Sequence, residues 1–250
     1  MVYEEVSDYY PSCVEIETTS HCNINPPCPM CARALRSVKD EHHISNPMMS
    51  KCRSLMEKSK LLSLTGIGEP LIDPRFGDLI AINKTGFLVF TSNAQLLTSK
   101  NIDIILSRPV DRVTFSLDAA TPHTYEKIRG YNLSTFGQVI GQIDNLIQTR
   151  NSRGLDKPAV RLGFVVMREN FHEIPSFVLL AHRLKVEGVA FWPLNTYEGV
   201  PEFVRNGWRY NETEQHKIPP SYMDEITKYG KYLHMEYGFS LDWRTKEGAA

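Results

Sequence analysis

The alternation of short apolar runs with longer amphipathic stretches constrains the fold more than any other feature of this sequence. Each apolar run has the length of a β-strand, and the stretches between them have the spacing of α-helices. Repeated βα units of this kind build a parallel sheet through right-handed crossovers. No repeat, low-complexity tract or Gly/Ser linker divides the chain, so we expect one large domain. The candidate strands are residues 13–18, 61–65, 87–92, 112–117, 160–166 and 189–193.

Two helices are predicted from apolar spacing together with an N-cap. Apolar side chains from residues 136–147 fall on one helical face, and Ser134 or Thr135 is the expected N-cap. A shorter helix is expected to begin at Thr121-Pro122, with threonine as N-cap and proline at the first helical position, and to run through Ile128. Both lie between candidate strands, as βα units require.

A third helix is expected after Asn170, because Glu173 follows three residues later in a capping-box-like arrangement. This helix precedes the sixth candidate strand. The residues it is expected to bury are Ile174, Phe177, Val178 and Leu184.

The composition is that of an ordinary globular protein. Apolar residues make up 42% of the chain and charged residues 23%, so a buried core can form without disulfides. The formal net charge of -1 gives no bias toward nucleic acid, and no nucleic-acid partner is expected. No stretch approaches the roughly 18 apolar residues of a membrane span, and the acidic N-terminus lacks the apolar segment of a signal peptide. We therefore expect a soluble, cytoplasmic protein without membrane association.

Three of the five cysteines, Cys22, Cys28 and Cys31, form the pattern C-x5-C-x2-C directly after the first candidate strand. This clustering indicates metal ligation in a reducing compartment rather than disulfides. A four-iron cluster normally takes four thiolates, so three leave one iron open to a small molecule. The competing interpretations are a structural zinc site and buried, inert thiols. The histidines that could supply a fourth zinc ligand are His21, His42 and His43.

A second motif, Thr65-Gly66-Ile67-Gly68-Glu69-Pro70, lies at the end of the second candidate strand. Glycines at a strand end let the backbone approach a ligand closely, and amide and carbonyl groups there can bind an amino acid moiety. An isolated glycine pair would more often form a simple tight turn. Because this pair accompanies the cysteine pattern, we interpret the motif as a binding segment.

The cysteine segment resembles the signature of the radical S-adenosylmethionine (radical SAM) superfamily, in which a strand leads into Cys-Asn-x-x-Cys-x-x-Cys. The usual spacing is C-x3-C-x2-C, and here two residues are inserted within Asn25-Pro26-Pro27. The two prolines would stiffen the enlarged loop by fixing φ. Residues 116–130 are similar to the fourth strand and following helix of the subfamily that often carries SPASM or twitch extensions, with Ala119 where glycine is usual. The resemblance covers roughly residues 12–195.

The resemblance implies an α/β fold, a partial (β/α)6 TIM-like barrel of parallel strands that binds its cofactors at the carboxyl ends of the strands. It also implies one [4Fe-4S] cluster, held by the three cysteines, with SAM beside it. Arg129 would pair with the SAM carboxylate, although a surface ion pair with Glu126 is an equal alternative. The other residues implied in SAM binding are Met30 at the adenine, Gly66, Gly68 and Glu69 at the amino group, Ser116 at the ribose or carboxylate, and Asn93.

The resemblance further implies an enzyme that cleaves SAM reductively to a 5'-deoxyadenosyl radical, which abstracts hydrogen from a peptide or small natural-product substrate. An external electron donor such as flavodoxin or ferredoxin would reduce the cluster. No cysteine follows Cys52, so we expect no auxiliary cluster, which favours epimerisation, lyase or rearrangement chemistry. Cys52 is a candidate hydrogen donor to a substrate radical, although a buried structural thiol is the commoner role for such a residue.

Two other functions are compatible with parts of the pattern. A non-catalytic zinc or iron-sulfur binding module would need a fourth protein ligand and would not need the glycine motif. A radical SAM enzyme that modifies RNA would need a basic groove with stacking aromatic residues, which this nearly neutral chain does not indicate.

The alternation of strands and helices ends after residue 193. We expect residues 1–195 to form the radical SAM core domain and residues 196–250 a C-terminal extension packed on it. Within the extension a loop or lid is expected first, then a helix over residues 221–234 and a short strand near residues 239–243. The aromatic residues that would form the lid, with ordinary surface packing as the alternative, are Tyr197, Phe203, Trp208 and Tyr210.

Overall fold

A computed structural model describes residues 10–35, 41–108, 110–129, 133–195, 203–205, 208–219 and 240–243, and four single positions between residues 221 and 228. Its centre is a parallel sheet in the order β1-β2-β3-β4-β5-β6-β9. The strands of this sheet are β1 (Cys13–Glu15), β2 (Leu61–Leu64), β3 (Phe87–Ser92), β4 (Arg112–Ser116), β5 (Ala159–Val166), β6 (Gly188–Pro193) and β9 (Ser240–Trp243).

The sheet is a partial, TIM-like barrel, which confirms the predicted fold class. All six candidate strands are present, and each pairs with its neighbours in sequence order. The strand expected near the C-terminus is also present as β9, which lies parallel to β6 and extends the sheet. The edge strands β1 and β9 do not pair with each other, so the sheet stays open.

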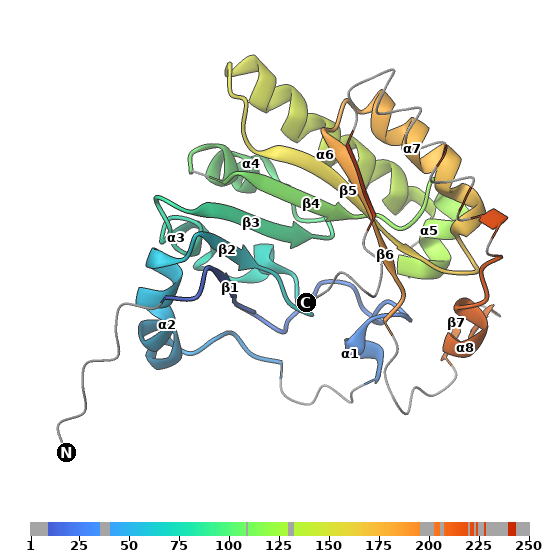
Figure 1. Cartoon of the computed structure of the whole chain (residues 1–250), viewed down its shortest axis with the longest axis horizontal. Helices are drawn as coiled ribbons and strands as arrows, with labels where there is room; N and C mark the ends of the chain where they lie inside the picture. The colour runs from blue at the N-terminus through green and yellow to red at the C-terminus, as the bar shows by residue number, and fades with distance from the viewer. Residues whose placement is uncertain are drawn as a thin grey trace.

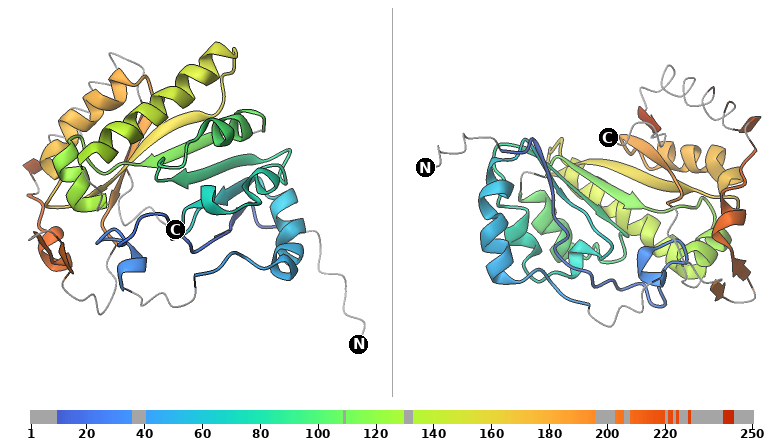
Figure 2. Two further views of the ribbon diagram at one scale, coloured as in Figure 1. Left: turned by 180° about the vertical axis from the view of Figure 1, so that it is seen from behind. Right: turned by 60° about the horizontal axis from the view of Figure 1, so that its bottom comes forward.

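Helices α4, α6 and α7 cover the convex face of this curved sheet (Figure 1), and α2 lies beside β1 (Figure 2). Ser45 caps α2 by accepting a hydrogen bond from the amide of Met48 at 3.3 Å. The helices are α1 (Ala32–Leu35), α2 (Asn46–Lys58), α3 (Phe76–Leu79), α4 (Ser99–Leu106), α5 (Pro122–Arg129), α6 (Leu133–Ser152), α7 (Ile174–Arg183) and α8 (Glu212–Gln215), with 3-10 turns η1 (Pro70–Ile72) and η2 (Phe171–Glu173).

Side chains alternate between the two faces of each strand, so one face of the sheet supplies the core and the other remains polar. The core face packs against α4, α6 and α7. Its members in the strands include Leu62, Leu64, Leu88, Phe90, Val113, Phe115, Leu162, Phe164, Val189 and Phe191. The concave face carries the small polar residues Ser63, Thr91, Thr114 and Ser116. The hydrophobic pattern thus leaves the inside of the barrel available for a ligand.

The predicted helical faces are correct, but two of the predicted caps are wrong. α6 already begins at Leu133, so Ser134 and Thr135 lie inside the helix rather than at its N-cap. Thr121 does cap α5, by accepting a hydrogen bond from the amide of Thr124 at 3.3 Å. The apolar face predicted for α6 is buried, apart from the partly buried Ile140.

Asn170 and Glu173 do not form a capping box. Asn170 Oδ1 accepts a hydrogen bond from the amide of Met167. Glu173 accepts hydrogen bonds from Ala120 N, just before α5, at 2.6 Å and from Thr124 Oγ1, in the first turn of α5, at 2.7 Å. Glu173 therefore joins the start of α5 to the start of α7 across about fifty residues of sequence. The residues predicted to be buried by α7 and its end are buried.

The expected lid is only partly described. Its described part contains an antiparallel pair, β7 (Phe203–Arg205) and β8 (Trp208–Tyr210), so this segment is not simply a loop. Tyr197 lies outside the described residues, as does most of the helix expected over residues 221–234. In the described part of the chain, no helix has the length and apolar character needed to cross a membrane.

Candidate functional site

The loop between β1 and α1 carries the three clustered cysteines. Its first part is tied to a later segment by hydrogen bonds from Ser20 N to the carbonyl oxygen of His42 at 3.0 Å and from Ile44 N to that of Thr18 at 2.8 Å. Its last part is a tight turn in which Cys31 N donates to the carbonyl oxygen of Cys28 at 2.9 Å. The backbone thus fixes both ends of the cysteine loop.

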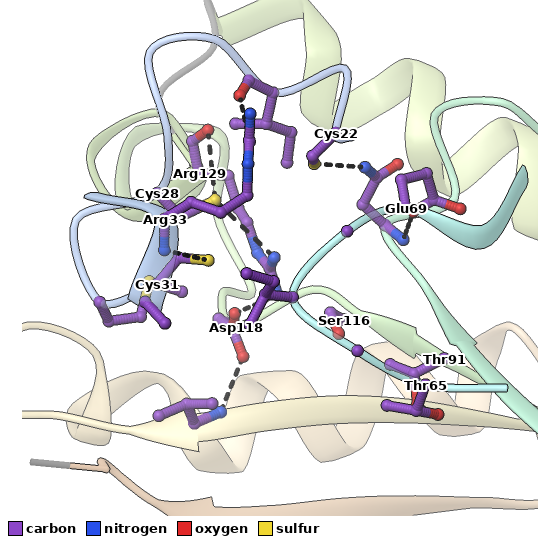
Figure 3. A pocket seen from close by; sticks show the side chains of 18 of the residues that line it. Cys22, Cys28, Cys31, Arg33, Thr65, Glu69, Thr91, Ser116, Asp118 and Arg129 are labelled. Carbon is purple, nitrogen blue, oxygen red and sulfur yellow. Dashed lines mark hydrogen bonds and ion pairs between the residues drawn. The ribbon is translucent and has the colours of Figure 1, made fainter. Parts of the chain in front are cut away.

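A cavity of about 560 Å³ lies beside this loop, at the carboxyl ends of the strands. All three cysteines contribute to its wall, together with every residue that the resemblance implies in SAM binding: Met30, Gly66, Gly68, Glu69, Asn93, Ser116 and Arg129. Figure 3 shows the three cysteines on one side of this space and Thr65, Thr91 and Ser116 on the other. Residues from widely separated sequence motifs therefore meet in one place.

Cys22 and Cys31 each receive a hydrogen bond from a nitrogen. Asn93 Nδ2 donates to Cys22 Sγ at 3.8 Å, and also to Asn23 Oδ1 at 2.8 Å. The backbone amide of Arg33 donates to Cys31 Sγ at 3.5 Å. Burial raises the pKa of both thiols. The backbone amide of Ile24 at Cys22 and that of Arg33 at Cys31 act in the opposite direction by favouring the thiolate that ligates metal.

Cys28 lies against Arg129, at the end of α5. Arg129 Nη1 is 3.9 Å from Cys28 Sγ, and the same sulfur is 3.9 Å from the carbonyl oxygen of Arg129. The guanidinium is buried and forms an ion pair with Asp118, not with Glu126. Burial raises the pKa of the Cys28 thiol, and the positive charge of Arg129 offsets part of this rise.

Glu69, predicted to bind the SAM amino group, is engaged by protein donors. Its carboxylate accepts hydrogen bonds from Asn93 N at 2.7 Å, Ser92 Oγ at 2.8 Å and Leu71 N at 3.2 Å. The amide of Glu69 donates to the carbonyl oxygen of His21 at 2.7 Å. Glu69 therefore joins the end of β2 to the end of β3 and to the residue before Cys22.

The two glycines of this motif have different surroundings. A Cβ on Gly68 would lie 2.0 Å from the backbone oxygen of Thr19 and 2.7 Å from that of His21, so only glycine allows this approach. A Cβ on Gly66 would meet the side chain of Glu17, an exposed residue whose Oε1 accepts from the amide of Ile67 at 2.6 Å. Gly68 thus docks the motif on the cysteine loop.

We expect the buried carboxylate of Glu69 to make stability pH-dependent. Burial raises its pKa to about 7, although its three donors favour the ionised form. Because the pKa of Glu69 is higher in the folded state than in the unfolded state, folding favours the protonated carboxyl. The stability that the protonated carboxyl contributes is complete below about pH 4.5 and is lost as pH rises through 7. Relative to Glu69→Gln, the wild-type apoprotein should lose up to about 3 kcal/mol of unfolding free energy across this range.

Urea unfolding of both proteins between pH 5 and pH 8, followed by tryptophan fluorescence, measures this difference. If the gap between wild type and Glu69→Gln stays constant over the range, the three donors keep Glu69 ionised throughout and the expectation is wrong.

Three residues of the site, Arg33, Trp192 and Asp118, were not predicted from the sequence. Arg33 is buried against the cavity, with Nη1 donating to the carbonyl oxygen of Ile24 at 3.2 Å and Nη2 paired with Glu41. Trp192 lies over Gly163, where a Cβ would come within 2.5 Å of the indole ring. A glycine in the middle of a candidate strand is the sequence signal that predicts such a close approach.

The remaining predicted residues lie as follows. Met30 packs against the buried apolar cluster of Ile128, Met167 and Leu194, and Met30 and Leu194 line an apolar corner of the cavity. Ser116 is half-buried at the end of β4. Cys52 lies on α2, packs against the hydrophobic core and is not among the residues that line the cavity.

The histidines considered as zinc ligands lie outside the cavity. His21 Nδ1 is 3.1 Å from Glu41 Oε2, and its ring lies 4.8 Å from that of His43. Within the described ranges, no three or more His, Cys, Asp and Glu side chains are gathered closely enough to share one metal ion.

Comparison with known proteins finds the same fold in solved structures with bound S-adenosylmethionine. No family model matches the sequence. A curated protein of Pyrococcus furiosus, the tungsten-containing aldehyde ferredoxin oxidoreductase cofactor-modifying protein, is 28% identical over 184 residues, or 70% of this chain and 49% of that protein. Streptococcus suis SuiB bound to S-adenosylmethionine has a TM-score of 0.69 at 14% identity, over 94% of this chain and 51% of SuiB.

A second similar structure is anSMEcpe with bound AdoMet, with a TM-score of 0.65 at 14% identity, over 94% of this chain and 64% of that chain. These structural neighbours are radical SAM enzymes, and the chain has their fold. It spans about half the length of the curated relative and of SuiB.

Proposed function

We propose that this chain is a radical SAM enzyme that uses one [4Fe-4S] cluster and SAM to abstract hydrogen from a peptide or small natural-product substrate. The observation that carries the proposal is the cavity at the carboxyl ends of the strands, in which the three cysteines meet the glycine motif and Ser116. When bound there, the reduced cluster with SAM supplies a 5'-deoxyadenosyl radical.

The donor set of the cavity fits an iron-sulfur cluster. Cys22, Cys28 and Cys31 would be its ligands, and three thiolates leave one iron for SAM. Nitrogen donors already face the three sulfurs, and N–H groups toward cluster sulfurs are typical of such sites.

The rest of the wall suits SAM. The backbone of residues 65–68 would offer amide and carbonyl groups for an amino acid moiety, apart from the amide of Ile67, which donates to Glu17 Oε1, and Ser116 would offer a hydroxyl for the ribose. The apolar corner around Met30 and Leu194 would receive the adenine. We assign Glu69 to holding this wall in place rather than to direct contact, because its carboxylate is already hydrogen-bonded by protein donors.

The substrate side of the cavity would be formed by Thr65, Thr91 and Trp192 on the concave face of the sheet. These neutral side chains would orient a substrate by hydrogen bonds and ring contact and would exclude water from the reacting atoms. An external donor such as flavodoxin or ferredoxin would supply the electron, and the extension over residues 196–250 would cover the site.

Two relatives support the choice of substrate class. One SuiB structure is described as bound to the precursor peptide SuiA, and the Pyrococcus furiosus relative is described as cofactor-modifying. A peptide or a small molecule therefore remains the proposed substrate, with epimerisation, lyase or rearrangement chemistry at a single cluster.

The decisive experiment is anaerobic reconstitution with iron and sulfide, followed by addition of dithionite and SAM and quantification of 5'-deoxyadenosine. The expected result is a brown, air-sensitive protein that forms 5'-deoxyadenosine. A colourless protein that binds one equivalent of zinc and forms none, even after reconstitution, would favour the non-catalytic zinc module instead.

A further inference from the structure

The ion pair between Arg129 and Asp118 is buried beside one of the cysteines. Arg129 is the last residue of α5 and is 9% exposed, and Asp118 follows β4 and is 1% exposed. Figure 3 shows the Arg129 guanidinium between the Asp118 carboxylate and Cys28. Both charges are out of water, so each acts strongly on its surroundings.

The ion pair with Asp118 orients the Arg129 guanidinium toward Cys28. Nη2 pairs with the Asp118 carboxylate, and Nη1 points to Cys28 Sγ at 3.9 Å. Two of its three nitrogens are therefore engaged by this chain, while the buried Nε has no hydrogen-bond partner within the described part of the structure. The SAM contact that the resemblance implies for Arg129 stays a prediction.

Asp118 is itself held firmly. Its backbone has a φ of +57°, a conformation that non-glycine residues rarely adopt. Asp118 Oδ1 accepts a hydrogen bond from the amide of Val165 at 2.7 Å, and the fully buried Asn170 donates to the Asp118 carbonyl oxygen at 2.9 Å. Strands β4 and β5 therefore fix the carboxylate that orients Arg129.

We infer that Arg129 is a positioning residue that raises the reduction potential of the cluster through Cys28, and that Asp118 limits this effect. The inference rests on the proposed function, because it requires a cluster on Cys28. Reduction adds one negative charge to the cluster, which a neighbouring cation stabilises and a neighbouring anion destabilises. An N–H donor to a ligand sulfur acts in the same direction as the cation.

The test is an anaerobic redox titration of the reconstituted full chain without SAM, in which the EPR signal of the reduced cluster is followed. Arg129→Gln should lower the midpoint potential, and Asp118→Asn, which keeps an oxygen for Val165 N, should raise it. Each change should alter the ratio of reduced to oxidised cluster at a fixed potential by about tenfold, or about 59 mV for a one-electron couple. The double variant should lie between the two single variants.

Glu126→Gln is the matched control, because it removes the same charge as Asp118→Asn from a half-buried position on α5. Its midpoint should equal that of wild type. If the single variants shift in the same direction, or if neither shifts, the pair acts only through packing and the inference is wrong. If Arg129→Gln does not hold a cluster, a midpoint of Asp118→Asn at or below wild type overturns the inference. A wild-type protein without any cluster signal would instead overturn the proposed function itself.

Discussion

Replacement of Cys22, Cys28 and Cys31 together by alanine is expected to abolish cluster formation and to reduce 5'-deoxyadenosine to the background level. The reason is the donor set of the cavity, in which these three side chains supply all the thiols. Without thiolates, no iron of the cluster can be held, and SAM has no reducible centre beside it. The measurement is the iron and sulfide content after anaerobic reconstitution, together with 5'-deoxyadenosine formed after addition of dithionite and SAM.

Cys52→Ala is the matched control for this experiment. Cys52 lies on α2, packed against the core and outside the cavity wall, so this variant should keep its cluster and form 5'-deoxyadenosine as the wild type does. The assignment of the three ligands fails if the triple variant binds iron and sulfide to the same extent as wild type. The hypothesis that Cys52 donates hydrogen to a substrate radical requires a defect in substrate turnover, which this assay separates from SAM cleavage.

Gly68→Ala is expected to lower the free energy of unfolding by about 3 kcal/mol and to reduce cluster occupancy. The added Cβ would lie 2.0 Å from the backbone oxygen of Thr19, and backbone cannot rotate away as a side chain can. The motif would have to move off the cysteine loop, which would break the hydrogen bond from Glu69 N to the carbonyl oxygen of His21. Urea unfolding and iron content of the reconstituted protein measure the two effects.

Gly66→Ala provides the comparison, since it adds the same methyl group two residues earlier. The nearest atoms there are Cγ, Oε1 and Cβ of Glu17, an exposed residue, at 2.5 to 2.7 Å, so relief requires a small shift of Glu17 as well as a new rotamer. We expect a smaller cost than for Gly68→Ala, about 1 kcal/mol, and normal iron content. Equal effects of the two substitutions would show that the docking of Gly68 on the loop does not stabilise the site.

Much of the fold followed from local patterns. The six candidate strands and the apolar face of α6 were predicted because a buried face requires a fixed hydrophobic period, which neighbouring residues display directly. The caps were predicted less well. Glu173 stands where a capping box would use it, yet its carboxylate binds the first turn of α5 instead. The donors that satisfy the buried Glu173 carboxylate come from residues distant in the sequence, so local spacing does not reveal them.

The sequence by itself determined the parallel βα architecture and which motifs belong to the candidate site. Only the tertiary structure decided what several of those residues do. Arg129 pairs with Asp118 and Cys28, and Glu69 binds the ends of two strands. The physical reason is that periodicity and spacing are local properties of a chain, whereas the partner of a buried charge depends on which distant groups the folded backbone brings within hydrogen-bond distance.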